Sequence, residues 1–306
     1  MSSANSPIAQ FIHATRPRTY PIAIMSLGVG QGLAYRTLGG FGLDNWALCV
    51  LIIYTALSLQ ILSNLANDLG DGIRGTDKDR HHDSPARLVG SGAVSAGRFR
   101  AWLVLWLTQT MMAGAMLIWL SPLTVYQIVL FFGLGAVSIL GALGYTMGKK
   151  PYGYHALGEL AVLIFFGYVA VLGGYYLQTG RADIAQNLPI ATGVGLLSAC
   201  VLYINNLRDT DTDRTSGKTT LAIVLGCYRI VGYFVLLYGA MMCYGYHAVV
   251  FGDRAWALVL CLPLLIKHTH AVITHRHSPA RLGKELGVTV RLVIVVNALM
   301  IGLVGV

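Results

Sequence analysis

Residues 46–66 read WALCVLIIYTALSLQILSNLA, and residues 67–77 continue as NDLGDGIRGTD. The first stretch contains no charged side chain, whereas the second contains Asp68, Asp71 and Asp77. About 20 consecutive, mostly apolar residues are enough for an α-helix to cross a lipid bilayer. The junction therefore predicts a membrane-spanning helix that ends directly in an acidic motif.

The composition extends this prediction to the whole chain. Of the 306 residues, 55% are hydrophobic and only 11% are charged, and the mean hydropathy is +0.63. A soluble fold of this size needs more charged side chains to cover its surface, and a disordered or collagen-like chain needs a different composition. The 36 glycines fit a membrane protein, because small residues let transmembrane helices approach closely. We therefore expect an integral membrane protein.

Nine apolar runs are long enough to span a membrane. They are continuously apolar and do not alternate as the strands of a membrane barrel do, so we expect an all-α, polytopic protein in which residues 1–306 form a single domain. The first run is not followed by a small-residue cleavage site and is expected to stay in the mature protein. The predicted spans lie near residues 20–37, 46–66, 101–120, 124–146, 155–178, 188–207, 229–250, 254–273 and 287–305.

The positive charges predict the orientation. The segments on the N-terminal side of the nine spans carry 19 of the 22 Lys and Arg residues, and the opposite side carries only Arg36, Arg181 and Arg254. Because cytoplasmic loops are enriched in Lys and Arg, we expect the N-terminus and the long loops in the cytoplasm and the C-terminus outside. Topology thus accounts for the net charge of +9, and the expected surroundings are a lipid bilayer with no nucleic-acid partner.

The acidic residues gather in two short stretches. Of the 13 acidic residues, five follow the second predicted span, between residues 68 and 83, and three follow the sixth, between residues 209 and 213. The two stretches compared below are residues 64–77 and 205–218. Aligning Asn67 with Asn205 places Asp71 on Asp209, so an Asn-x3-Asp element recurs 138 residues later. The match is short, and it indicates a weak internal repeat.

The spacing within these stretches suggests a metal site. On a helix, Asn67 and Asp71 share one face, and so do Asn205, Asp209 and Asp213. Clustered carboxylates repel one another unless a cation neutralises them, and oxygen ligands without His or Cys favour Mg²⁺. Two solvated loops of mixed charge are the simpler interpretation, but the matching register in both stretches favours a site. Basic residues between the acids could bind phosphate oxygens, which suggests a diphosphate leaving group: Arg74, Lys78, Arg208, Arg214 and Lys218.

Other polar residues indicate a site less strongly. A carboxylate at Glu159, near the start of the fifth span, is a functional candidate, with an interfacial structural role as the alternative. Tyr145 and Tyr203 fall near the cytoplasmic ends of the fourth and sixth spans and are the better site candidates among the tyrosines. A basic cytoplasmic loop explains the remaining cluster better than a metal site does: His268, His270, His275 and His277.

These features resemble the UbiA superfamily of intramembrane prenyltransferases, in the number of spans, the orientation and the position of both acidic motifs. Within it, the chain is most similar to the 1,4-dihydroxy-2-naphthoate polyprenyltransferase branch. Three stretches carry this similarity: residues 64–77, residues 145–160 with Tyr145-Thr146 and Leu157-Gly158-Glu159-Leu160, and residues 205–222.

One departure separates the chain from other members of the superfamily. Many of them, including 4-hydroxybenzoate prenyltransferases, carry Asn-Asp-x2-Asp-x3-Asp, whereas here Gly75 occupies the last position and Asp77 follows two residues later. The longer spacing resembles the naphthoate branch. In that branch the position of Asp68 need not be acidic, which favours Asp71 over Asp68 as a ligand.

The resemblance implies a nine-helix bundle around a central cavity and a Mg²⁺-dependent transfer of a polyprenyl group from polyprenyl diphosphate to 1,4-dihydroxy-2-naphthoate. Loss of CO2 then gives demethylmenaquinol, a step of menaquinone biosynthesis at the bacterial inner membrane, with the active site facing the cytoplasm. The implied catalytic residues are Asn67, Asp71, Asp209 and Asp213. The implied Mg²⁺ ligands are Asn67, Asp68, Asp71, Asp77, Asp209 and Asp213. The implied donor-binding residues are Arg74, Lys78, Arg208, Arg214, Lys218, Tyr145 and Lys149, and candidates for the acceptor carboxylate are Lys149, Lys150 and Arg16.

Two other functions stay open from the sequence. One is prenyl transfer to a different aromatic acceptor such as 4-hydroxybenzoate. The other is an ion-coupled transporter with paired Asn and Asp sites, although transporters place such sites at the midplane rather than at the ends of spans. A phospholipid head-group transferase is disfavoured, because Asp71-Gly72-Ile73-Arg74-Gly75 does not match its Asp-Gly-x2-Ala-Arg pattern.

Overall fold

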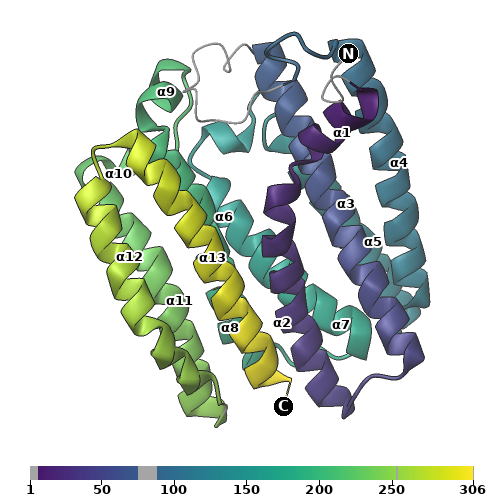
Figure 1. The fold of residues 1–306 in the computed structure, drawn as a ribbon. Coiled ribbons are helices and arrows are strands. Elements are labelled where there is room, and N and C mark those ends of the chain that lie inside the picture. The colour runs from purple at the N-terminus through teal and green to yellow at the C-terminus, as the bar shows by residue number, and fades with distance from the viewer. Residues whose placement is uncertain (1–5, 75–87, 253, 306) are drawn as a thin grey trace.

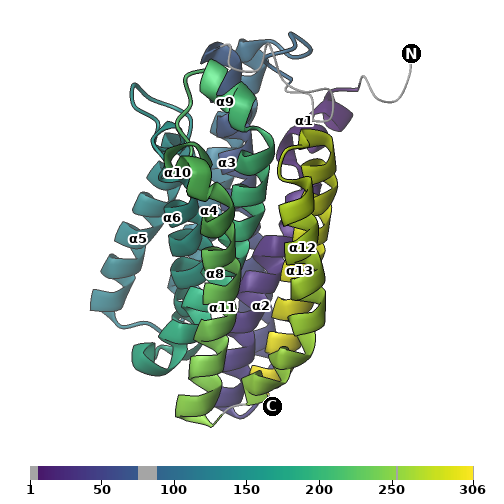
Figure 2. The same cartoon turned by 90° about the vertical axis from the view of Figure 1, so that its left-hand side faces the viewer.

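The computed structural model describes residues 6–74, 88–252 and 254–305. Within these ranges the chain is helical, and the one β-type contact is an isolated parallel bridge between His155 and Thr219. The predicted all-α fold class is confirmed. Long helices run side by side along one direction and form a bundle (Figures 1 and 2).

Over the described residues, nine passes cross the bundle, and their bounds lie close to the predicted spans. Short elements at the ends are α1 (Pro7–Thr15), η2 (Pro17–Thr19), η3 (Tyr152–Tyr154) and α9 (Thr210–Thr215). Six passes consist of one long helix: α2 (Tyr20–Leu38), α3 (Leu43–Arg74), α4 (Ala96–Leu120), α5 (Val125–Gly144), α8 (Ile184–Arg208) and α13 (Pro279–Val304). The other three are composite: α6 (Gly158–Val162), η4 (Leu163–Gly173) and α7 (Gly174–Thr179); α10 (Leu221–Leu225), η5 (Gly226–Tyr228) and α11 (Arg229–Phe251); and η6 (Arg254–Cys261) with α12 (Leu262–His275).

Eight of these passes are long and apolar enough to span a membrane, and α2 is the exception. Its 19 residues reach about 28 Å at ~1.5 Å per residue, which is close to the thickness of the hydrocarbon core. Much of α2 is enclosed by α13, η4, α7 and α3, and Gln31 is buried there. A helix that faces protein rather than lipid can be less apolar, so the first predicted span corresponds to a bundle helix of lower hydropathy.

Both acidic stretches lie at the same end of the bundle as the N-terminus, and the C-terminus lies at the opposite end (Figure 1). The first stretch remains helical up to Arg74, at the C-terminal end of α3. In the second, α8 ends at Arg208 and α9 begins at Thr210. The break is slight, because Asp209 still donates its N–H to the oxygen of Asn205 and its own oxygen accepts the N–H of Asp213 at 2.8 Å. The helical spacing assumed for the motif is therefore retained.

The core of the bundle is organised around α8. Two thirds of its most apolar window (67%) is buried, compared with at most 39% in the other spans, and it packs against α11, η4 and α13. Two glycines allow its closest approach. A Cβ on Gly167 of η4 would lie 2.5 Å from the backbone oxygen of Ala191, and a Cβ on Gly195 of α8 would lie 2.7 Å from that of Leu163. This contact brings the Gly158–Thr179 pass against α8 and sets the spacing beneath the acidic stretches.

The Gly167 contact predicts a specific loss of stability. In Gly167→Ala the new methyl group meets a backbone oxygen that cannot move away, so we expect a destabilisation of about 1–3 kcal/mol. Gly133 of α5 is the matched control, because a Cβ added there would meet nothing within 4 Å and alanine is the better helix former. Thermal unfolding of the detergent-solubilised proteins measures the change in stability for each variant. Equal transition temperatures for Gly167→Ala and Gly133→Ala would show that the close approach is unimportant.

Candidate active site

Asp71 is positioned by the close contact of α3 with the loop that follows α5. A Cβ on Gly70 would lie 2.8 Å from Oγ1 of Thr146 and 2.9 Å from its backbone oxygen, so only glycine allows this approach. On the same side of α3, the Tyr154 hydroxyl donates a hydrogen bond of 2.8 Å to Oδ1 of Asp71. Thr146 donates to Oδ1 of Asn67 at 3.1 Å. Asn67 and Asp71 thus face the same loop, as their i, i+4 spacing predicts.

Asp68 points in a different direction. Its carboxylate accepts the backbone N–H of Leu88 at 3.2 Å and that of Val89 at 3.1 Å. Asp68 is rotated by about 100° around the helix from Asn67, and its two hydrogen bonds turn it away from the loop that Asn67 and Asp71 face. In this structure the carboxylate anchors the segment that leads into α4.

The acids of the second stretch are held by basic neighbours. Arg208 donates two hydrogen bonds to the carboxylate of Asp209. Its Nε lies 2.6 Å from Oδ1, and one terminal nitrogen lies 2.7 Å from Oδ2. It also donates to Oδ1 of Asn205 at 2.8 Å. The ammonium nitrogen of Lys218 lies 3.4 Å from Oδ1 of Asp213. These donors offset the repulsion between carboxylates that lie close together.

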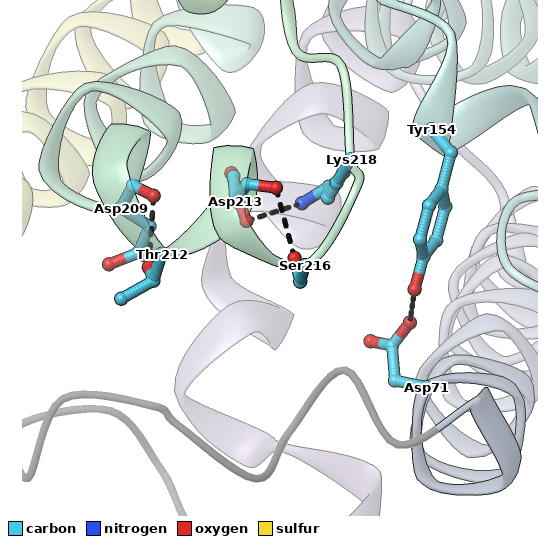
Figure 3. Close-up of a pocket in the computed structure, with 7 residues that line it drawn as sticks. All are labelled: Asp71, Tyr154, Asp209, Thr212, Asp213, Ser216 and Lys218. Carbon is cyan, nitrogen blue, oxygen red and sulfur yellow. Dashed lines mark hydrogen bonds and ion pairs between the residues drawn. The ribbon is translucent and has the colours of Figure 1, made fainter.

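A polar pocket brings both stretches together (Figure 3). Asp209 and Asp213 lie on one side of it, and Asp71 lies on the other side, where the phenol of Tyr154 reaches it. Carboxylates from two stretches that lie 138 residues apart in the sequence therefore surround one space. The pocket is lined by Asp71, Tyr154, Asp209, Thr212, Asp213, Ser216 and Lys218.

A backbone contact ties the two loops of the pocket to each other. The N–H of Ala156 donates to the oxygen of Thr219 at 2.8 Å, and the N–H of Thr219 donates to the oxygen of Tyr154 at 3.1 Å. Tyr154 therefore contacts the first stretch through its side chain and the second through its backbone. The sequence analysis did not single out Tyr154, Thr212 or Ser216. Their positions were the only signal, because Tyr154 lies within residues 145–160 and the other two lie within the second acidic stretch.

Tyr145 and Tyr152, which lie between α5 and α6, stay protonated near neutral pH. Burial raises the pKa of Tyr152 to about 12. Burial, and then the negative charges of Glu159, Asp71 and Asp213, raise the pKa of Tyr145 well above its usual value. A phenol with a raised pKa is a hydrogen-bond donor and not a base, so Tyr145 can donate to an anionic ligand but cannot accept a proton from one.

The other candidates from the sequence lie further from the pocket or outside the described residues. Arg74 is exposed and covers the ring of Tyr154, with 5.5 Å between the guanidinium carbon and the ring centroid. Tyr203 donates to the backbone oxygen of Arg229 at 2.6 Å. Exposed basic residues that do not line the pocket are Lys149, Lys150 and Arg214, and the candidates outside the described residues are Asp77 and Lys78.

The histidine cluster forms a structural network elsewhere in the bundle. Nδ1 of His268 in α12 lies 2.9 Å from a carboxylate oxygen of Glu285 in α13, and His275 approaches the other oxygen of that carboxylate at 3.3 Å. The hydroxyl of Tyr233 lies 2.7 Å from Nε2 of His268. These contacts join α11, α12 and α13.

The donor set of the pocket fits Mg²⁺. Its described lining residues offer carboxylate and hydroxyl oxygens and include no His or Cys. Across the described ranges, no three Asp, Glu, His or Cys side chains converge on a ready-made metal cage. Mg²⁺ typically retains several waters and is held by one or two carboxylates together with the phosphates of a substrate, so an open arrangement of acids suits it.

Comparisons with known proteins agree with this geometry. The chain matches the UbiA prenyltransferase family over residues 24–285. It is 40% identical to 1,4-dihydroxy-2-naphthoate octaprenyltransferase from Haemophilus influenzae over 268 residues, which cover 86% of this chain and 85% of the relative. It is 36% identical to the Escherichia coli protein of the same name over 299 residues, which cover 95% and 93% of the two chains.

Solved structures show the same fold. A UbiA homologue from Archaeoglobus fulgidus, bound to DMAPP and Mg²⁺, aligns with a TM-score of 0.62 at 15% identity and covers 96% of this chain and 99% of that one. The apo structure of a UbiA homologue from Aeropyrum pernix aligns with a TM-score of 0.66 at 18% identity, with 94% and 96% covered. Taken together with the two acidic helix ends around one pocket, these matches show that the chain belongs to the UbiA prenyltransferase family.

Proposed function

We propose that this protein transfers a polyprenyl group from polyprenyl diphosphate to 1,4-dihydroxy-2-naphthoate, with loss of CO2 and formation of demethylmenaquinol. The observation that carries the proposal is the pocket in which carboxylates of both acidic stretches and Lys218 meet at one end of an apolar bundle. The names of the Haemophilus influenzae and Escherichia coli relatives support naphthoate as the acceptor. The bacterial relatives support an inner-membrane location, and the positive-charge bias supports an orientation with this end in the cytoplasm.

The acids of the pocket would hold Mg²⁺. We assign this role to Asp71, Asp209 and Asp213, with Asn67 beside Asp71 and with Asp77 as a further ligand from outside the described residues. Asp68 is the weaker candidate, because its carboxylate already accepts two backbone N–H groups. When bound, Mg²⁺ would neutralise the negative charge that grows on the departing diphosphate.

The basic side chains would bind the diphosphate oxygens. Lys218 lines the pocket beside Asp213, so its ammonium group can donate to a phosphate and to the carboxylate at once. Arg208 already donates two hydrogen bonds to Asp209. Its role would therefore be to orient that carboxylate and to add positive charge near the diphosphate. Tyr145 stays protonated and can donate from the loop. Arg74, Lys78, Lys149 and Arg214 would extend the positive charge around the mouth of the site.

The bond changes follow from these positions. The bond between C1 of the prenyl chain and the diphosphate oxygen breaks, and its electron pair leaves on the diphosphate. An electron-rich carbon of the naphthoate ring forms the new bond to C1, and the ring loses its carboxyl group as CO2 and a proton. Water would quench the allylic cation, so the apolar helices below the pocket serve to exclude it.

A product assay tests the reaction and its acceptor. We expect detergent-purified protein with Mg²⁺ and a polyprenyl diphosphate to convert 1,4-dihydroxy-2-naphthoate into a prenylated, decarboxylated naphthoquinol, detected by mass spectrometry. A chelator should abolish the product, and added Mg²⁺ should restore it. Prenylated 4-hydroxybenzoate, offered separately, would keep the reaction type but overturn the acceptor. No product with either acceptor would favour an ion-coupled transporter instead.

Substitution of the pocket acids tests the metal assignment. Asp71→Asn and Asp209→Asn each remove a charged ligand with little change in side-chain volume, so we expect turnover to fall about 100-fold or more, equivalent to about 3 kcal/mol. Asp211→Asn is the matched control, because Asp211 lies in the same motif but is exposed and does not line the pocket. The rate of product formation at saturating Mg²⁺ distinguishes the three variants. Full activity in the first two would contradict the assignment.

Substitution of Tyr154 tests whether its hydrogen bond orients Asp71. In Tyr154→Phe the ring under Arg74 remains but the hydrogen bond to Asp71 is lost, so we expect a higher Mg²⁺ concentration for half-maximal rate and a roughly tenfold lower rate below saturation. Tyr152→Phe is the control, because that phenol donates to the backbone oxygen of Gly141 and does not line the pocket. Identical Mg²⁺ titrations for the two variants would mean that Tyr154 does not orient Asp71.

A further inference from the structure

Glu159 is a buried carboxylate that the assigned roles do not use. It is the second residue of α6, at the start of a membrane pass, and only 4% of its surface is exposed. Charged side chains in such positions are costly and are retained where they have a partner or a function. The neighbouring Gly158 lets the phenol of Tyr145 lie within 3.3 Å of the place that a Cβ would occupy. Glu159 therefore lies in the polar layer directly behind the loop of the pocket.

Only one oxygen of the carboxylate has a partner among the described residues. Oε1 accepts a hydrogen bond of 2.8 Å from the amide nitrogen of Asn206, which is 3% exposed. Oε2 of Glu159 and Oδ1 of Asn206 are both buried, and neither has a hydrogen-bond partner in the ranges described. A buried polar atom without a partner is destabilising, and for a charged group the cost is larger. Two adjacent acceptors without donors indicate a ligand that donates hydrogen bonds.

The position of the pair relative to the acids limits what this ligand can be. Asn206 lies on α8 and precedes Asp209, the residue that directly follows this helix, by three residues, or about 4.5 Å along the helix axis toward the membrane. The charges of Lys218 and Asp213 act on Glu159, so the pair lies within electrostatic reach of the pocket. The carboxylate of Glu159 repels a bare phosphate, so a neutral hydrogen-bond donor fits the pair better than a second diphosphate does. The aromatic acceptor carries two hydroxyl donors, and its ring must lie beside C1 of the prenyl chain.

We propose that Glu159, held by Asn206, binds the acceptor: its Oε2 accepts a hydrogen bond from a ring hydroxyl of the naphthoate. This assignment rests on the proposed function and deepens it. The hydroxyl donor satisfies the carboxylate oxygen, and the hydrogen bond increases the electron density of the ring that attacks C1. The acceptor ring then lies on the membrane side of the diphosphate, in line with its prenyl chain. Glu159 and Asn206 therefore set the preference for a hydroxylated acceptor.

Glu159→Gln is the decisive variant. The glutamine oxygen can still accept from Asn206, and its NH2 group can satisfy Oδ1 of Asn206, so the bundle should fold. The hydroxyl loses its charged acceptor, and we expect KM for 1,4-dihydroxy-2-naphthoate to rise about 10-fold or more, because hydrogen bonds to charged groups are worth more than neutral ones. KM for the polyprenyl diphosphate should change by no more than about twofold. That change is well below the roughly tenfold rise expected for the acceptor, which corresponds to about 1.4 kcal/mol.

Glu285→Gln is the matched control. Glu285 is also a buried carboxylate in a membrane pass, but it contacts His268 and His275 away from the pocket. Its neutralisation should leave both KM values unchanged. A rise in the acceptor KM of the same size in Glu285→Gln would show that the effect comes from a general loosening of the bundle, and the assignment of Glu159 would be overturned.

Acceptor analogues separate hydroxyl recognition from a purely structural role. We would measure the inhibition constants of 1,4-dihydroxy-2-naphthoate analogues that lack one hydroxyl or carry it as a methyl ether. In the unmodified protein, removal of the recognised hydroxyl should weaken binding about 10-fold, and in Glu159→Gln this difference should disappear. Equal weakening of every analogue by Glu159→Gln would mean that the residue only supports packing. A dependence of activity on monovalent cations that vanishes in Glu159→Gln would assign the two oxygens to an ion and overturn the proposal.

The outcomes for the two proposals are distinct. If the unmodified protein forms no prenylated naphthoquinol, the proposed function fails and this assignment fails with it. If the unmodified protein turns over normally and Glu159→Gln has the same acceptor KM, the assignment of Glu159 alone is wrong.

Discussion

The site depends on keeping carboxylates from two distant helix ends around one small pocket although they repel each other. Asp71 lies near the end of one helix, and Asp209 and Asp213 follow another, 138 residues later. Each acid has a nearby donor: Tyr154 for Asp71, Arg208 for Asp209 and Lys218 for Asp213. These donors offset the repulsion between the carboxylates.

The backbone around the pocket supports this arrangement through close approaches that need glycine. Gly70 admits Thr146 to the surface of α3, and the Gly167 and Gly195 contact brings the Gly158–Thr179 pass against α8. Because that pass carries Glu159 and α8 carries Asn206, the same contact that packs the core also forms the buried polar pair. Packing in the membrane and chemistry at its surface are therefore linked by one helix interface, where small residues replace the hydrophobic driving force that is absent in lipid.

Much of the fold could be predicted, because the features that indicate it lie within short, continuous segments of the sequence. The apolar runs alone indicated the passes, and the positions of the acids relative to those runs indicated the end of the bundle that carries the site. The spacing Asn-x3-Asp correctly placed Asn67 and Asp71 on one face of α3. Hydropathy described α2 less well, because that helix is enclosed by others and its composition is set by its protein neighbours rather than by lipid.

Hydrophobicity, helix length and i, i+4 spacing are properties of contiguous residues. The order of the amino acids was therefore enough to predict a helical membrane protein with two acidic stretches. The contacts that these residues make were set by the packing of the helices. This packing turned Asp68 toward Leu88 and Val89 and brought Tyr154 to Asp71. Beside Asn206, it left one oxygen of Glu159 without a donor among the residues that the structure describes. Each of these outcomes depends on contacts between residues from 20 to 83 positions apart, and such contacts exist only after the helices have packed.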